Sequence, residues 1–299
     1  MNQSKNIYTA VGIGEVLFDI FPSCKKLGGA PVNFAYHLNS LGINCYPVSA
    51  VGKDKTGMEL TKTIQSNSLS TEYIQINSGY PTGTVQVELD DQGIPNYVIH
   101  ENVAWDNIEM NDELLNLAWN CNVVCFGTLA QRSDLSKQTI RNFIENSSDN
   151  CIKVFDINLR QHYYSDEIIN NSLRLASVLK LNNDELSEVA SLFGYAGSSE
   201  SILSKLMSNF GLKLIAVTQG SEGSILVSSE KVSSMKPETI SVLDTVGAGD
   251  AFTAGLVFGL LMNFDIDKTN RFANQLASYV CSKTGANPTL EAGLLDKFK

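Results

Sequence analysis

The feature that most constrains the fold of this chain is an alternation of short apolar runs with amphipathic segments of helical length. Apolar runs bounded by turn residues predict buried strands, and the segments between them have helical spacing. Strands joined by helices form a parallel sheet with helices on both faces. We predict strands at 8–13, 45–51, 123–126, 152–156, 178–181 and 214–218, and helices at 34–41, 56–67, 135–146, 167–176, 184–193, 201–210 and 251–262.

One stretch has a different pattern. Residues 84–89 alternate strictly between apolar and polar side chains, which predicts a strand. Residues 90–93 form a predicted turn, and 96–99 form the second strand of a predicted hairpin. Such a hairpin has one polar face, so we expect it beside the main sheet, with an extended piece at 16–21. The prediction is an α/β fold with three α/β/α layers, a central mostly parallel sheet and a small antiparallel lid. We expect a single domain over 1–299, with a lid formed by about 15–22 and 82–105.

The composition excludes several classes of function. Of the 299 residues 43% are hydrophobic, and the net charge is −10, which argues against a nucleic-acid partner because such binding needs basic patches. Residues 1–14 lack the pattern of a signal peptide, and no run approaches the length of a membrane span. Six cysteines are scattered without a Cys-x-x-Cys pair. We therefore expect a reduced, cytoplasmic protein with no membrane partner and no zinc cluster.

The clearest chemical signal is the segment 244–250, Asp-Thr-Val-Gly-Ala-Gly-Asp. Gly247, Ala248 and Gly249 precede a helical segment, so their N–H groups can face an anion at the positive end of the helix dipole. Asp250 adds a carboxylate, which suits a general base that takes a proton from a hydroxyl group attacking a phosphoryl group. The alternative is that Asp250 caps the helix. These residues alone leave both interpretations open.

Two other nucleotide-binding motifs are excluded. The pair Gly12-x-Gly14 lacks the third glycine of the dinucleotide fingerprint, since position 17 is leucine. The P-loop pattern Gly-x4-Gly-Lys-Ser/Thr does not occur in the sequence. Phosphate binding would therefore depend on residues 247–249.

Two segments resemble the signatures of the ribokinase-like (PfkB-type) carbohydrate kinases. Residues 244–257 are similar to the C-terminal signature, and 28–35, Gly-Gly-Ala-Pro-Val-Asn-Phe-Ala, are similar to the N-terminal one. The resemblance extends over essentially the whole chain. It implies a ribokinase-like fold and ATP-dependent phosphorylation of a sugar hydroxyl group, with Mg²⁺ as cofactor and K⁺ as a further candidate.

The resemblance also implies roles for single residues. Asp250 would be the catalytic base, and Gly247, Ala248 and Gly249 would form an anion hole for the transferring phosphoryl group. The substrate would be bound by Asp19, Gly29, Asn33, Gln131 and Arg160, the last of these near the phosphates. The nucleotide would be bound by Asn182, Thr218, Gly220, Gly223 and Asn274. Glu185 would hold Mg²⁺ through water, and a K⁺ ion would be held by Asp244 and by backbone oxygens of 244–246 and 280–285.

Some of these residues have simpler interpretations. Asn182 and Glu185 are also the residue types of a helix N-cap and a first-turn acid. Asp19 could be a turn residue at a strand end, and Arg160 could pair with an acid at the surface.

The sugar is indicated by the loop that begins at Gly28. Ribokinases and fructose-1-phosphate kinases of the family usually carry lysine at its third position, whereas this chain has Ala30 followed by Pro31. Together with residues 14–19, they are similar to the fructokinase branch. Residues 84–99 contain no Lys or Arg, which favours a neutral hexose. We predict the conversion of D-fructose to fructose 6-phosphate, with 2-keto-3-deoxygluconate and ribose as alternative sugars. A catalytically silent sugar-binding regulator is the alternative from another class, and a homodimer formed through the lid is a further expectation.

Overall fold

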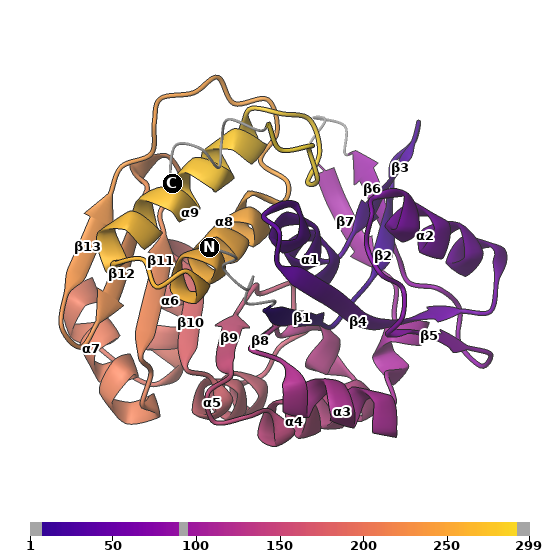
Figure 1. Cartoon of the computed structure of the whole chain (residues 1–299), viewed down its shortest axis with the longest axis horizontal. Helices are drawn as coiled ribbons and strands as arrows, with labels where there is room; N and C mark the ends of the chain where they lie inside the picture. The colour runs from indigo at the N-terminus through magenta and orange to yellow at the C-terminus, as the bar shows by residue number, and fades with distance from the viewer. Residues whose placement is uncertain (1–7, 90–94, 292–299) are drawn as a thin grey trace, which may run out of the picture.

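The structure is a computed structural model and describes residues 8–89 and 95–291. Within these residues the centre is a nine-stranded sheet of order β13-β12-β11-β10-β9-β8-β1-β4-β5 (Figure 1). The strands from β11 to β5 run parallel, whereas β12 and β13 are antiparallel additions at one edge. The strands are β1 (Thr9–Ile13), β4 (Asn44–Gly52), β5 (Ile74–Asn77), β8 (Val123–Phe126), β9 (Ile152–Asp156), β10 (Val178–Asn182), β11 (Leu214–Thr218), β12 (Ser224–Ser228) and β13 (Val232–Met235).

Helices cover both faces of this sheet. One apolar core lies under α1 (Ala30–Ser40), α2 (Lys55–Ser66), α8 (Ala248–Leu261) and α9 (Ile266–Cys281). The other lies under α3 (Asp112–Asn120), α4 (Asp134–Asn146), α5 (Asp166–Leu175), α6 (Asn183–Leu192) and α7 (Ser199–Phe210). In β8, Val124 and Phe126 join the second core while Val123 and Cys125 join the first. Burial on both faces explains why the strand is apolar at every position.

The predicted three-layer fold is confirmed, and each predicted strand and helix of the main layers is present with ends that differ by a few residues. Five helices and strands of the main layers were not predicted, namely α3, α9, β5, β12 and β13. Strands β12 and β13 are rich in serine, so they lack the continuous apolar run that marks the parallel strands, and β13 is an edge strand. Helix α9 packs only one side on the core, and its sequence is close to neutral in hydropathy.

The predicted small sheet is a separate four-stranded unit of order β3-β2-β6-β7. Its strands are β2 (Leu17–Ile20), β3 (Lys25–Gly28), β6 (Thr84–Leu89) and β7 (Pro95–Ile99). The β6–β7 pair is the predicted hairpin, whose turn lies outside the described residues. The central pair β2–β6 is parallel, because these strands belong to different hairpins and no tight turn joins them.

Strand β3 corrects one premise about the lid. The prediction took the lid to lack basic residues, but β3 was not predicted and carries Lys25 and Lys26. Lysines are common on edge strands, where they prevent unwanted pairing, and they obscure the apolar signal that identifies a strand. The lid therefore contains two lysine side chains, both on strand β3.

No helix in the described ranges is both long enough and apolar enough to cross a bilayer.

Candidate active site

The first turn of α8 is shaped by Gly247. This residue is the helix N-cap and has φ 77°, a left-handed conformation that glycine adopts without strain. A Cβ atom at position 247 would lie 2.5 Å from Cβ of Ala286, so no other residue fits. The first N–H groups of a helix have no partner within it. In α8 the Ala248 N–H donates to the carbonyl oxygen of Thr245 at 3.3 Å, a long hydrogen bond that an anion could replace. The first turn of α8 can therefore serve an anion.

Asp250 occupies the third position of α8 and not the cap. No side chain caps this helix, so the capping interpretation of Asp250 is wrong. Its carboxylate instead accepts a hydrogen bond from Asn33 Nδ2, with 2.8 Å between Nδ2 and Oδ2. Asn33 comes from the first turns of α1, which Pro31 opens.

The surroundings of Asp250 suit a general base. The net pKa of Asp250 is raised to about 7, mainly by burial and next by the negative charge of Asp156. The Asn33 hydrogen bond and the charges of Lys180 and Arg160 act in the opposite direction. A base that titrates near neutral pH combines a large ionised fraction with useful proton affinity.

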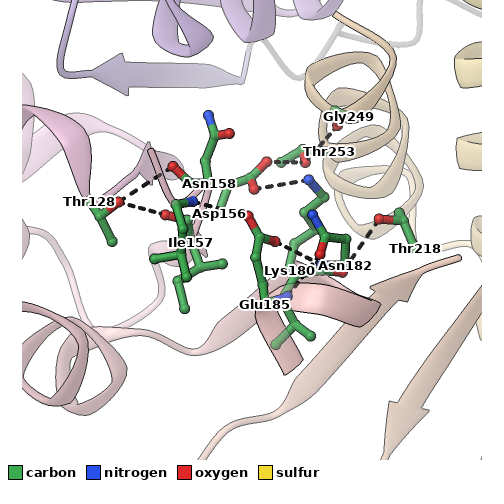
Figure 2. Close-up of polar contacts among 12 residues, drawn as sticks. Thr128, Asp156, Ile157, Asn158, Lys180, Asn182, Glu185, Thr218, Gly249 and Thr253 are labelled. Atoms are coloured by element: carbon green, nitrogen blue, oxygen red, sulfur yellow. Dashed lines mark hydrogen bonds and ion pairs between the residues drawn. The ribbon is translucent and has the colours of Figure 1, made fainter. Parts of the chain in front are cut away.

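A buried ion pair lies beneath this turn (Figure 2). Lys180 Nζ donates to Asp156 Oδ1 at 3.0 Å, and both side chains are less than 9% exposed. The hydroxyl group of Thr253 donates to Asp156 Oδ2 at 2.7 Å and also lies 3.0 Å from the carbonyl oxygen of Gly249. These contacts connect strands β9 and β10 to the first turns of α8.

Lys180 was missed by the sequence predictions. Burial alone would lower the pKa of Lys180, but the charges of Asp156 and Glu185 raise it, so the ammonium group stays protonated. A Cβ atom at Gly249 would lie 3.2 Å from Nζ, which places this charge against the anion-binding turn. The sequence signal was a lysine inside the apolar strand Val178–Asn182. Burial of an unpaired charge is energetically unfavourable, so such a lysine indicates a buried acidic partner.

Asn182 and Glu185 form a reciprocal capping box at the start of α6. Asn182 Oδ1 accepts from the Glu185 backbone N–H at 2.9 Å, and Glu185 Oε2 accepts from the Asn182 N–H at 2.8 Å. Glu185 Oε1 also accepts from the backbone N–H of Leu159 at 3.0 Å. The capping interpretation is therefore confirmed. Each carboxylate oxygen keeps lone-pair capacity, so a water-mediated metal role is compatible with it.

A cavity of about 610 Å³ lies between the lid and the turn of α8. Its lining brings together most of the predicted substrate and catalytic residues, namely Asp19, Gly29, Asn33, Arg160, Gly247, Gly249 and Asp250. Burial raises the pKa of Asp19 to about 6, against the nearby charges of Arg160 and Lys26. Leu17, Val85 and Ile99 from the lid give the cavity one apolar side.

Gln131 is not part of this group. Its Nε2 donates to the carbonyl oxygen of Gly127 at 2.7 Å and to Ser172 Oγ at 3.0 Å, and the side chain is buried. It belongs to the short helix η2 (Leu129–Arg132), where Leu129 faces the large cavity and Gln131 lines a different one. Its sequence position beside a strand end did not determine which way it turns.

Besides Asn182 at the end of β10, three of the predicted nucleotide residues lie at or just beyond the end of β11, and one lies on α9. Thr218 ends the strand, and Gly220 and Gly223 have positive φ in the turn that follows. Asn274 on α9 is 7% exposed, and its Nδ2 donates to Ser224 Oγ at 2.6 Å. None of these four lines the large cavity in the described residues.

Asp244 joins the two segments expected to bind K⁺. Its Oδ1 accepts from the backbone N–H of Val246 at 3.1 Å, and its Oδ2 accepts from that of Gly285 at 3.0 Å. Lys26 Nζ of the lid lies 4.0 Å from Oδ2. The carboxylate thus connects the loop before α8 with the chain after α9.

Two further residues of the site were not predicted. Glu15 lines the large cavity, and its Oε1 accepts from the Ala30 backbone N–H at 3.2 Å. Burial raises the pKa of Glu15. Asn287 reaches Asn33 from the C-terminal segment. Asn287 belongs to no local pattern, and Glu15 lies in the segment 14–19 but had no predicted role, so only the folded chain places both residues at the site.

Comparisons with known proteins identify the family of the chain. The model of the pfkB family of carbohydrate kinases matches residues 24–292. An uncharacterized sugar kinase of Pyrococcus horikoshii is similar, with 28% identity over 92% of this chain and 87% of that protein. Its crystal structure matches with a TM-score of 0.82 over 97% of each chain, and another of its structures contains ATP.

Two other relatives have named substrates or activities. An ATP-dependent 6-phosphofructokinase of Thermoanaerobacterium thermosaccharolyticum is 27% identical over 93% of this chain and 89% of its own length. A fructokinase of Salmonella typhimurium is 28% identical over 84% of each chain.

Proposed function

Because this chain belongs to the pfkB family of carbohydrate kinases, whose members phosphorylate sugars with ATP, we propose that its acceptor is D-fructose and its product fructose 6-phosphate. The observation that carries the proposal is the position of Asp250. Its carboxylate, with a pKa of about 7, lines a lid-covered cavity beside the N-terminus of α8. A base, an anion-binding turn and a hydroxyl-binding cavity are what phosphoryl transfer to a sugar requires.

In this proposal Asp250 accepts the proton of the attacking hydroxyl group. Asn33 holds the carboxylate through the 2.8 Å hydrogen bond, so the base keeps one orientation. The N–H groups of Gly247, Ala248 and Gly249 stabilise charge on the transferring phosphoryl group, and the Lys180 ammonium group beneath them adds positive potential. The lid excludes water, which would otherwise compete with the sugar as acceptor.

Asp19, Gly29 and Arg160 would contact the substrate from the lid side of the cavity. We assign nucleotide binding to Asn182, Thr218, Gly220, Gly223 and Asn274 around the ends of β10 and β11. The Nδ2 group of the buried Asn274 already donates to Ser224 and Asn270. Contact with the nucleotide would therefore need the side-chain oxygen atom of Asn274 or a shift of its amide group. Gln131 would support the site only through the position of η2.

The protein groups fit a divalent metal bound mainly by nucleotide and water. In the described part of the chain no cluster of three or more His, Cys, Asp or Glu side chains could hold a metal ion. Mg²⁺ commonly keeps several waters and binds through phosphates and one or two carboxylates. We propose Glu185 as the carboxylate that contacts a Mg²⁺-bound water. The ion would supply neutralisation of phosphate charge when bound.

We also propose a K⁺ site at Asp244. The carboxylate already connects residues 246 and 285. N–H groups that face phosphate leave neighbouring carbonyl oxygens pointing away, and a weakly hydrated cation can satisfy these oxygens. The ion would hold the turn in its anion-binding shape.

Fructose is favoured by Ala30 and Pro31 in the first signature and by the similarity to a fructokinase. A phosphorylated fructose is the second candidate, because Lys26 lines the cavity and could contact a sugar phosphate. The similarity to a 6-phosphofructokinase agrees with it. Lys26 also lies 4.0 Å from Asp244, so part of its charge is already balanced.

The test is an ADP-release assay with ATP and Mg²⁺ over fructose, fructose 6-phosphate, ribose, 2-keto-3-deoxygluconate and glucose. We expect the highest kcat/KM with fructose. Lys26→Ala should leave that value nearly unchanged, whereas it should lower turnover of fructose 6-phosphate if that sugar is the substrate. Asp250→Asn should lower kcat by about 10²- to 10⁴-fold on the best sugar. A preference for another sugar contradicts the fructose assignment. Sugar binding without turnover would instead support a silent regulator.

A further inference from the structure

We infer that Asn287 is a positioning residue for the catalytic base and acts through Asn33. Asn287 Nδ2 donates to Asn33 Oδ1 at 3.0 Å, and Asn33 Nδ2 donates to Asp250 Oδ2 at 2.8 Å. The three side chains come from the C-terminal segment, α1 and α8. The inference rests on the proposed role of Asp250 as the base.

The direction of these hydrogen bonds gives Asn287 its role. An amide side chain can be turned over, which exchanges its donor NH₂ group for its acceptor oxygen. Only one orientation of Asn33 places NH₂ against the Asp250 carboxylate, and the other would place two acceptors together. A donor at Asn33 Oδ1 selects the productive orientation. Asn33 is 5% exposed, so bulk water cannot readily replace that donor.

The segment that carries Asn287 is attached at two further points. The carbonyl oxygen of Ala286 lies 2.9 Å from Nε2 of His37, which is fully buried on α1. Burial lowers the pKa of His37 to about 4, so the ring is neutral at pH 7 and donates through Nε2. Positions 33 and 37 are one turn apart on the same side of α1. Ala286 also packs against Gly247 at the anion-binding turn.

The expected consequence concerns the ionisation of Asp250. The hydrogen bond from Asn33 is one of the interactions that lower the pKa of Asp250 against the effect of burial. If Asn287 is lost, Asn33 samples both orientations and this stabilisation of the carboxylate weakens. The pKa of Asp250 then rises, and a smaller fraction of the base is ionised at neutral pH.

The first experiment uses Asn287→Ala, which removes the donor without adding a charge. We expect the acidic limb of the kcat/KM profile to move up by about half a pH unit to one unit. At pH 7 kcat/KM should fall about twofold to fivefold, with the KM for ATP within about twofold of wild type. Glu291→Gln is the matched control, because Glu291 lies in the same segment and pairs with Lys283 rather than with Asn33. Its profile should coincide with wild type.

A double-mutant cycle separates positioning from a general structural effect. In the Asn33→Ala background, Asn287→Ala should have almost no further effect, because its only route to Asp250 is gone. A purely structural role would lower kcat without moving the acidic limb, and the loss would persist in that background. Either result would overturn the inference.

A readout without turnover keeps the inference separate from the choice of sugar. The carboxyl carbon of Asp250 can be titrated by NMR in the free enzyme, and Asp250→Asn assigns its signal. We expect a higher pKa in Asn287→Ala than in wild type or Glu291→Gln. Equal pKa values in all three contradict the role of Asn287. Failure to phosphorylate fructose, with the pKa shift present, contradicts only the proposed substrate.

Discussion

The electrostatic environment of Asp250 can be tested by the sign of two changes in the pH profile. Asp156 raises the pKa of Asp250 and Lys180 lowers it, although the two form one ion pair with 3.0 Å between Nζ and Oδ1. Asp156→Asn should therefore lower the pKa of Asp250. Lys180→Met should raise it, since the negative charge of Asp156 is then unopposed.

The magnitude follows from the pKa of about 7 for Asp250. At that value about one-tenth of the base is ionised at pH 6 and about nine-tenths at pH 8, so wild-type kcat/KM should rise about tenfold between them. Removal of a nearby like charge lowers a pKa by about one unit or more. In Asp156→Asn the same rise should shrink to about twofold. In Lys180→Met the activity should still be climbing at pH 8.

The assay is initial rate at limiting sugar and saturating ATP from pH 5.5 to 9, at constant ionic strength. Breaking a buried pair on one side costs about 3–5 kcal/mol, so thermal unfolding must show that each variant is folded at the assay temperature. The double variant Asp156→Asn/Lys180→Met removes both charges and should titrate closer to wild type than Lys180→Met does. Shifts of the same sign in the two single variants would refute this account of the site.

Three further predictions concern stability and the ion. Because the pKa of Asp250 is raised in the folded state, the ionised carboxylate destabilises the fold above its ordinary titration range, so Asp250→Asn should stabilise the protein by on the order of 1 to 3 kcal/mol at pH 8. At pH 4 thermal unfolding should show only a small part of this gain, because the carboxyl group is protonated in the folded state and only partly ionised in the unfolded chain. An equal gain at both pH values would point to another cause. Gly247→Ala should destabilise by about 1–3 kcal/mol and lower kcat at least tenfold. Gly211→Ala is its control, since Gly211 has φ 68° but no atom within 4 Å of the added Cβ, and an equal loss of unfolding free energy would show that the contact with Ala286 is unimportant. Exchange of KCl for tetramethylammonium chloride at fixed ionic strength should lower the rate if Asp244 binds K⁺, and unchanged rates would remove that site.

The parts of the fold that could be predicted are those in which one local pattern has one structural outcome. Val123–Phe126 is apolar at every position because both faces of β8 are covered, and the sequence shows this directly. The turn before α8 was predictable for a similar reason, since Gly247 adopts a backbone conformation that other residues adopt only with strain. Such signals are complete within a few residues.

The parts that could not be predicted depend on contacts between distant segments. Asn287 and Asn33 are 254 positions apart, and the sequence around either residue does not indicate a contact with the other. Lys180 was visible as an odd residue in an apolar strand, but its partner Asp156 lies on the neighbouring strand. Gln131 was predicted to bind substrate but does not line the large cavity, and the reason is different. It follows a strand end, as site residues do, yet the turn of η2 directs it to Ser172 in the core.

The long-range packing of α8 explains how the chain keeps a charged first turn that begins at a glycine of positive φ. Gly247 and Asp250 both oppose folding, the first through backbone freedom lost on ordering and the second through burial of a carboxylate. Beyond this turn α8 is almost wholly buried and apolar. Gly255 allows a close approach to α9, because a Cβ there would lie 2.8 Å from Cα of Ala273. Figure 1 shows the two helices side by side. Dense packing along α8 therefore offsets the unfavourable folding free energy of its first turn. It also holds that turn rigid, which phosphoryl transfer requires in the proposed function.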